Sequence, residues 1–104
     1  MHQALLKLII GFDWDDGNRN KSFRKHDVSP EEAEQVFVNT PLLIAKDDKH
    51  SGIEPRHQAL GRTHEDRRLF ISFTVRNHVI RIISTRPMSR AERRSYEKEI
   101  EENS

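Results

Sequence analysis

The chain has 104 residues, which fits one domain with a modest core. Apolar and charged residues each make up 34% of it, so much of the surface must be charged. No segment approaches the roughly 20 apolar residues of a membrane span. The short run ALLKLII, which Lys7 interrupts, is not expected to be a signal peptide. The absence of cysteine excludes a disulfide framework and thiolate chemistry, and it fits a cytoplasmic protein.

The net charge of +1 hides an uneven distribution of charge along the chain. Between Arg56 and Arg94 there are ten arginines, three acids and no lysine, whereas the acids gather in DWDD, PEEAE and EKEIEE. A basic block of this kind indicates a surface that binds phosphate or an acidic partner. Arginine makes forked contacts that suit phosphate and carboxylate groups. The other interpretation is a solvated face that binds nothing.

The first 40 residues predict a strand followed by two helices. LLKLIIGFDWD, residues 5–15, is apolar and β-branched in its middle and reads as a strand. NRNKSFRKH, residues 18–26, predicts a short helix that needs packing against its neighbours. In VSPEEAEQVF, Ser29 and Glu32 form a capping box that starts the next helix. Its apolar stripe consists of Ala33, Val36 and Phe37.

After Pro41 the pattern changes to strands. LLIAK and RHQALGRT are predicted strands, and the polar stretch DDKHSGIEP is a loop between them. Apolar residues alternate strictly in RRLFISFTVR, and the two-residue turn NH joins this strand to HVIRIISTR in an antiparallel hairpin. SRAERRSYEKEIEE opens with a second capping box, Ser89 and Glu92, and its thin apolar content predicts a helix on the surface of the domain.

These elements predict a single α+β domain over residues 1–104. Two N-terminal helices pack on one face of an antiparallel sheet, a C-terminal helix follows, and the other sheet face is left to solvent. The hairpin makes Arg76, Arg81 and Arg86 near neighbours, although alternation alone does not place them on one face.

Several motifs are specific in combination. They are W-D near the start, K-H-x-V-S before the second helix, G-R in a middle strand, and I-R-I-I-S-x-R leading into E-R-x-x-Y. Together, over about residues 12–98, they resemble the BrnT family, the toxins of BrnT–BrnA type II toxin–antitoxin modules. The sequence departs from the family pattern at Asp27, where glycine is common, and at Thr85, where alanine is common. The charged motif residues are unchanged.

The resemblance implies a compact RelE-like fold and a metal-independent ribonuclease that inhibits translation. It also implies a partner antitoxin, BrnA, which neutralises the toxin and represses the shared operon. A hetero-oligomer with the antitoxin is therefore expected, and contact with operator DNA only through the antitoxin. No cofactor is expected.

A metal-free ribonuclease can use the 2′-OH of its substrate as the nucleophile on the adjacent phosphate. The protein must then supply a base for the 2′-OH proton, cations for the phosphate oxygens and an acid for the leaving 5′-oxygen. Arg62, Arg81 and Arg86 are the candidate cations. For each, the other interpretation is an exposed ion pair with the acidic segments.

The sequence leaves the base open between three residues. Glu92 is already explained by its capping box. Lys25 and His26 could supply base or acid. The ordinary pKa of histidine is about 6.5, and nearby cations can lower the pKa of a lysine. Both are equally explained as cations that favour the C-terminal end of a helix.

Further RNA contacts are predicted from Arg76, Arg90, Arg93 and Tyr96. Tyr96 could stack on a base, or it could be the anchor of the last helix. The competing function is a non-catalytic basic module that binds nucleic acid or an acidic protein. Six scattered histidines without cysteine do not predict a zinc site, and four separated glycines do not predict a nucleotide-binding loop.

Overall fold

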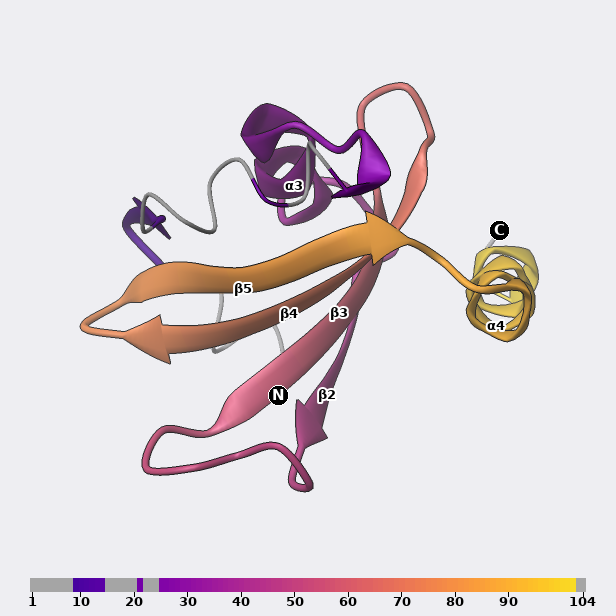
Figure 1. Ribbon diagram of the computed structural model, residues 1–104. Coiled ribbons are helices and arrows are strands. Elements are labelled where there is room, and N and C mark those ends of the chain that lie inside the picture. The colour runs from indigo at the N-terminus through magenta and orange to yellow at the C-terminus, as the bar shows by residue number, and fades with distance from the viewer. Residues whose placement is uncertain (1–8, 15–20, 22–24, 103–104) are drawn as a thin grey trace.

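A computed structural model describes residues 9–14, 21 and 25–102. A five-stranded sheet with the order β1-β5-β4-β3-β2 forms the centre of the domain (Figure 1). Helix α3 lies over one face of the sheet, and helix α4 lies beyond the ends of the long strands. The elements are β1 (Gly11–Asp13), α3 (Pro30–Val36), β2 (Leu43–Asp47), β3 (Arg56–Arg62), β4 (Arg68–Arg76), β5 (Val79–Pro87) and α4 (Arg90–Glu102).

Helix α3 begins at the predicted capping box. The Ser29 hydroxyl accepts a hydrogen bond from the Glu32 amide, and the Glu32 carboxylate accepts one from the Ser29 amide. One face of the helix buries Ala33 and Val36 against the sheet. The core between them consists of Val28, Ala33, Val36, Ile44, Ala59, Leu69, Ile71, Phe73, Ile80 and Ile82.

Two features of the predicted fold are corrected. We expected two N-terminal helices on the sheet, but one complete helix, α3, precedes β2 in the described residues; the predicted helix at 18–26 lies mostly outside them. We also expected an antiparallel sheet, but β1 pairs with β5 in parallel, which makes the sheet mixed. A parallel pair needs a crossover or a long return path, which short-range turn signals do not reveal.

The hairpin of β4 and β5 is confirmed, and it contains a bulge. Asn77 and His78 form its turn with φ of 53° and 66°, the pair of positive values that characterises a type I′ turn. Further along, Phe73 pairs with Ile82 but Ser72 pairs with Ser84, so Ile83 has no partner on β4. This one-residue insertion reverses the inside–outside alternation of β5 beyond it.

Helix α4 is held at the ends of the strands through Tyr96. The side chain of Tyr96 is fully buried, and its hydroxyl donates a 2.5 Å hydrogen bond to the carbonyl of Pro41. The Arg68 guanidinium lies 5.5 Å from the centre of the Tyr96 ring and forms an ion pair with Glu97. Neither helix in the described part of the chain is long and apolar enough to cross a membrane.

Gly61 allows α3 to approach the sheet closely. A methyl group at Gly61 would lie 2.5 Å from Cγ1 of Val36, which is itself fully buried. Valine is stiff at its first side-chain torsion and cannot move aside cheaply. The glycine of the G-R motif is therefore explained by packing of helix on strand.

We expect Gly61→Ala to lower the free energy of unfolding by about 1–3 kcal/mol, because the added methyl overpacks the α3 interface. Urea denaturation measures the change. Gly52→Ala is the matched control, since a methyl there meets nothing within 4 Å. Combining Gly61→Ala with Val36→Ala should cost less than the sum of the two single changes; simple additivity would contradict the clash.

Candidate active site

The sheet face opposite α3 carries the strand arginines. Arg81 pairs across the hairpin with Thr74, and Arg86 pairs with Phe70, so both lie on the face of Phe70, Ser72 and Thr74. Strict alternation would put residues 81 and 86 on opposite faces. The bulge at Ile83 brings them onto the same one.

Arg86 is fixed by two neighbours on this face. Its Nη1 and Nη2 atoms donate to Oε1 and Oε2 of Glu92 at 2.8 and 3.0 Å, a bidentate pair. Its guanidinium carbon lies 4.0 Å from the centre of the Phe70 ring, a cation–π contact. With a third bond to the carbonyl of Pro87, the bonds to described residues use three of the five N–H donors of the guanidinium. The other two have no partner among the described residues.

Glu92 belongs both to the capping box of α4 and to this pair. Its Oε1 also accepts from the Ser89 amide at 2.8 Å. The hydrogen bonds from Arg86, with the Ser89 amide and against the effect of burial, hold the pKa of the Glu92 carboxyl below its ordinary value of 4.5. A carboxylate held in this way is a weak base, so the geometry favours Glu92 as the residue that orients Arg86.

Lys25 and His26 lie beside Arg86. A pocket of about 210 Å³ is lined by Lys21, Lys25, His26, Ser84, Thr85 and Arg86. It follows the part of β5 that β1 does not cover, since β1 pairs only with residues 79–81. Two of the three candidate bases therefore share a pocket with Arg86, and the third, Glu92, binds it directly.

Arg67 fixes the segment that carries His26. Its guanidinium donates to the carbonyls of His26 and Asp27 at 3.1 and 2.6 Å and forms an ion pair with Glu32. Asp27 has a φ of 56°, a left-handed conformation in which aspartate is tolerated and glycine is favoured. The aspartate at this position therefore fits the turn, and so would the glycine that the sequence resemblance led us to expect.

The other candidate residues do not line the pocket of Lys25, His26 and Arg86. Arg62 forms an ion pair with Asp66 at 3.5 Å. Arg76 forms a bidentate pair with Glu54 at the other end of the sheet face opposite α3, which we call the open face. Arg90 and Arg93 are exposed on α4. Tyr96 is corrected: its ring is 0% exposed and has no face to offer a base, and burial raises the pKa of its hydroxyl. The anchor interpretation of Tyr96 holds.

Two residues on the open face were missed by the sequence reasoning. Phe70 supports Arg86, and Arg56 lines a second pocket. Phe70 could have been found from its place in the strict alternation of its strand, opposite the core residues. Arg56 gives no comparable signal, because its position depends on the register between β2, β3 and β4.

No group of three or more His, Asp or Glu side chains that could hold a metal ion is present among residues 9–14, 21 and 25–102. The charged side chains around Arg86 are the cationic Lys21 and Lys25 and the carboxylate of Glu92, which Arg86 already binds. An excess of cations of this kind suits an anion.

Comparison with known proteins identifies first the fold and then the family of this chain. The fold is similar to the crystal structure of the Brucella abortus ribonuclease toxin BrnT, with a TM-score of 0.57 and 18% identity over 78% of this chain and 99% of that chain. At that identity the likeness establishes the fold. A family model described as the ribonuclease toxin, BrnT, of type II toxin–antitoxin systems matches residues 14–92. The chain therefore belongs to the BrnT family of ribonuclease toxins. No curated protein sequence matches it.

The Arg86–Glu92 pair predicts a pH dependence of stability. The pKa of Glu92 is lower in the folded protein than in the unfolded chain. The contribution of Glu92 to the free energy of unfolding is therefore complete above the unfolded pKa near 4.5, and it is lost as the pH falls through the folded pKa. We expect Glu92→Gln to cost about 1–2 kcal/mol at pH 7, from a half-exposed ion pair and a lost cap. This cost should shrink below pH 4.5.

Urea denaturation of both proteins from pH 7 to pH 3 measures this difference. Glu65→Gln, at an exposed turn position, is the control for the change of charge. A difference that stayed constant down to pH 3 would show that the carboxylate charge of Glu92 contributes nothing to the pair.

Proposed function

We propose that this BrnT-family toxin is a metal-independent endoribonuclease that cleaves RNA, and so inhibits translation, at a site centred on Arg86. The observation that carries the proposal is the position of Arg86 between Glu92, which binds it bidentately, and a pocket lined by Lys25 and His26. This arrangement combines a fixed cation for phosphate with groups able to transfer protons.

In the proposed reaction the 2′-OH attacks the adjacent phosphorus. The base takes the 2′-OH proton, the new bond forms between the 2′-oxygen and phosphorus, and the bond to the 5′-oxygen breaks. The acid protonates the leaving 5′-oxygen, so the products are a 2′,3′-cyclic phosphate and a 5′-OH. Arg86 stabilises the charge on the non-bridging oxygens with the N–H groups that Glu92 and Pro87 leave unused.

Roles are assigned from the contacts. His26 is the proposed base and Lys25 the proposed acid, because both adjoin Arg86, an imidazole nitrogen can accept a proton and an ammonium group can only donate one. Glu92 is proposed to orient Arg86 rather than to take a proton, since its pKa is lowered. Arg81 and Arg62 are proposed to attract the RNA backbone and not to touch the reacting atoms.

A type II toxin has an antitoxin protein as partner. We propose a BrnA-like antitoxin that neutralises this toxin in the cytoplasm and represses the shared operon, so that the toxin reaches operator DNA only through it. An acidic or amphipathic segment of that antitoxin would pack over the arginine-bearing strands β4 and β5, because the same charges that attract RNA attract carboxylates.

The alternative is a binding module that does not cut RNA. It is favoured by the extent of the basic face, which continues to Arg56, Arg76 and Arg81 well away from the proton-transfer candidates. Binding needs only this charge, whereas catalysis also needs His26 or Lys25.

Cleavage of single-stranded RNA in the presence of EDTA tests the proposal. We expect the wild type to release 2′,3′-cyclic phosphate ends. Arg86→Ala should lower the rate by about 10²–10³-fold, as for loss of one charge-stabilising donor. His26→Ala should lower it by about 10²–10⁴-fold, as for loss of a general base. Arg94→Ala, an exposed arginine on α4 with the same change of charge, should cleave normally.

The melting temperature of each variant must be checked, so that unfolding is not mistaken for lost chemistry. Activity that EDTA abolishes would contradict metal independence. A folded wild type that binds RNA but cuts neither free RNA nor mRNA on translating ribosomes would favour the binding module.

A further inference from the structure

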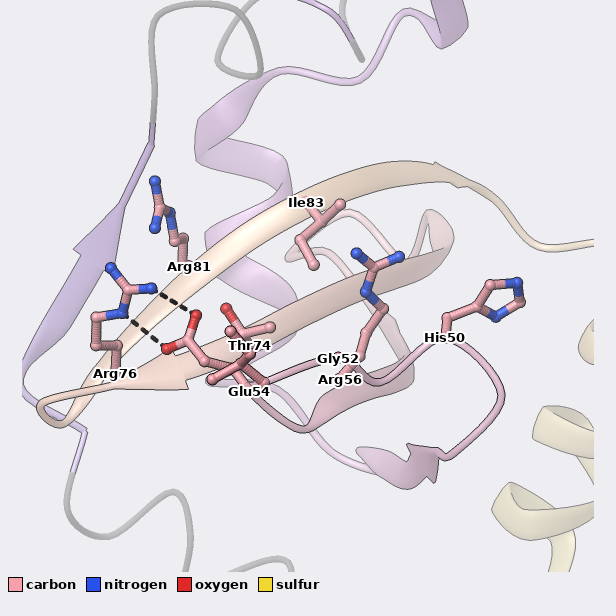
Figure 2. Close-up of a pocket in the computed structure, with 9 residues that line it drawn as sticks. His50, Gly52, Glu54, Arg56, Thr74, Arg76, Arg81 and Ile83 are labelled. Atoms are coloured by element: carbon pink, nitrogen blue, oxygen red, sulfur yellow. Dashed lines mark hydrogen bonds and ion pairs between the residues drawn. The ribbon is translucent and has the colours of Figure 1, made fainter.

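A second pocket lies at the other end of the open face from Arg86. It has a volume of about 470 Å³ and lies between the loop before β3 and strands β4 and β5 (Figure 2). The loop contributes His50, Gly52, Ile53 and Glu54, and the strands contribute Arg56, Thr74, Arg76, Arg81 and Ile83.

An ion pair joins the loop to strand β4. Arg76 donates from Nε and Nη2 to the two carboxylate oxygens of Glu54 at 2.7 and 2.6 Å, as the dashed lines in Figure 2 show. The hydrogen bonds from Arg76 keep the pKa of Glu54 below its ordinary value. The charges of these two residues therefore cancel, and the pair acts as a wall of the pocket.

Two arginines remain available to a ligand. Arg56 extends over the open face toward Ile83 (Figure 2), and in the described part of the chain no carboxylate forms an ion pair with it. Arg81 lies 3.9 Å from the exposed Asp13, a long pair that solvent screens. Arg81 also acts on the Glu54 carboxylate. Three guanidinium groups and a single carboxylate, that of Glu54, nevertheless line this concave site, and such an excess of positive charge favours the binding of an anion.

Residues of the same sheet face lie between this pocket and the Arg86 site. Gln58 lies two residues beyond Arg56 on the same face of β3 and lines a smaller pocket together with Leu60, Phe70 and Glu92. Arg86 lies five positions after Arg81 on β5, about 15 Å along the strand. A single-stranded chain of a few nucleotides could span the two sites.

We propose that Arg56 and Arg81 form a phosphate-binding subsite that holds the RNA backbone a few nucleotides away from the cleaved bond. This inference rests on the proposed ribonuclease function and extends it to substrate length. The subsite binds RNA without taking part in the reaction, so it raises affinity for longer RNA and leaves the chemical step at Arg86 unchanged. Ile83, the bulged residue, provides apolar surface between the two arginines.

Binding of a 2′-O-methyl RNA tests the subsite separately from cleavage, because this RNA has no 2′-OH to attack. With a single-stranded oligomer of about 12 nucleotides, a length typical of single-strand sites, we expect Arg56→Ala and Arg81→Ala each to weaken binding about tenfold. Each should also reduce the slope of log affinity against log salt by about one, as for a lost phosphate contact. Arg94→Ala is the control.

Cleavage kinetics give the second measurement. With a cleavable RNA of the same length as the oligomer, Arg56→Ala should raise KM about tenfold and leave kcat unchanged. With a dinucleotide substrate, Arg56→Ala should change neither KM nor kcat. The inference is overturned if Arg56→Ala binds the oligomer as the wild type does, if Arg94→Ala weakens binding equally, or if the dinucleotide is affected as strongly as the long RNA. A wild type that binds the oligomer but never cuts overturns the ribonuclease proposal, while loss of oligomer binding in Arg56→Ala would still support the subsite.

Discussion

The bulge at Ile83 is the constraint on which the open face depends. Without it, the alternation of β5 would direct Arg81 and Arg86 to opposite sides of the sheet, and one of them would meet the core beneath α3. With it, Ile80, Ile82 and Thr85 point inward and both arginines point outward. One unpaired residue thus reconciles a buried hydrophobic strand with a continuous basic face.

The two ends of the Arg86 site are fixed by charged residues that also stabilise local structure. Glu92 caps α4 and orients Arg86, and Arg67 binds the carbonyls of His26 and Asp27 while pairing with the capping residue Glu32. Such sharing fixes the Arg86 and Glu92 side chains and the backbone that carries His26 at little extra cost in side-chain entropy. It also couples stability to the site, because removing Glu92 disturbs a helix terminus and an arginine together.

The sequence predicted local features well, but it did not predict how strands and side chains distant in sequence pair with one another. Both capping boxes, the two-residue hairpin turn and the core-facing residues Leu69, Ile71 and Phe73 of β4 follow from short-range rules, and all are observed. The opposite side of β4 is less exposed than expected, because Ser72 and Thr74 are buried. The parallel pairing of β1 with β5 and the place of Arg56 depend on long-range register, which no local pattern encodes. Tyr96 shows the same limit: its spacing from Glu92 fits a shared surface, yet packing against Pro41 buries it.

The sequence by itself determined the α+β class, the strand and helix order after residue 28, the arginine-rich block and the resemblance to BrnT toxins. These depend on periodicity, capping chemistry, composition and motif spacing, all of which are local or additive along the chain. Only the tertiary structure decided which arginines share a face, which carboxylates neutralise them and which of them remain available to phosphate. Those outcomes depend on one bulge, on strand register and on a loop folded over the sheet. Charged residues form a binding site only where side chains that are distant in sequence come together in space.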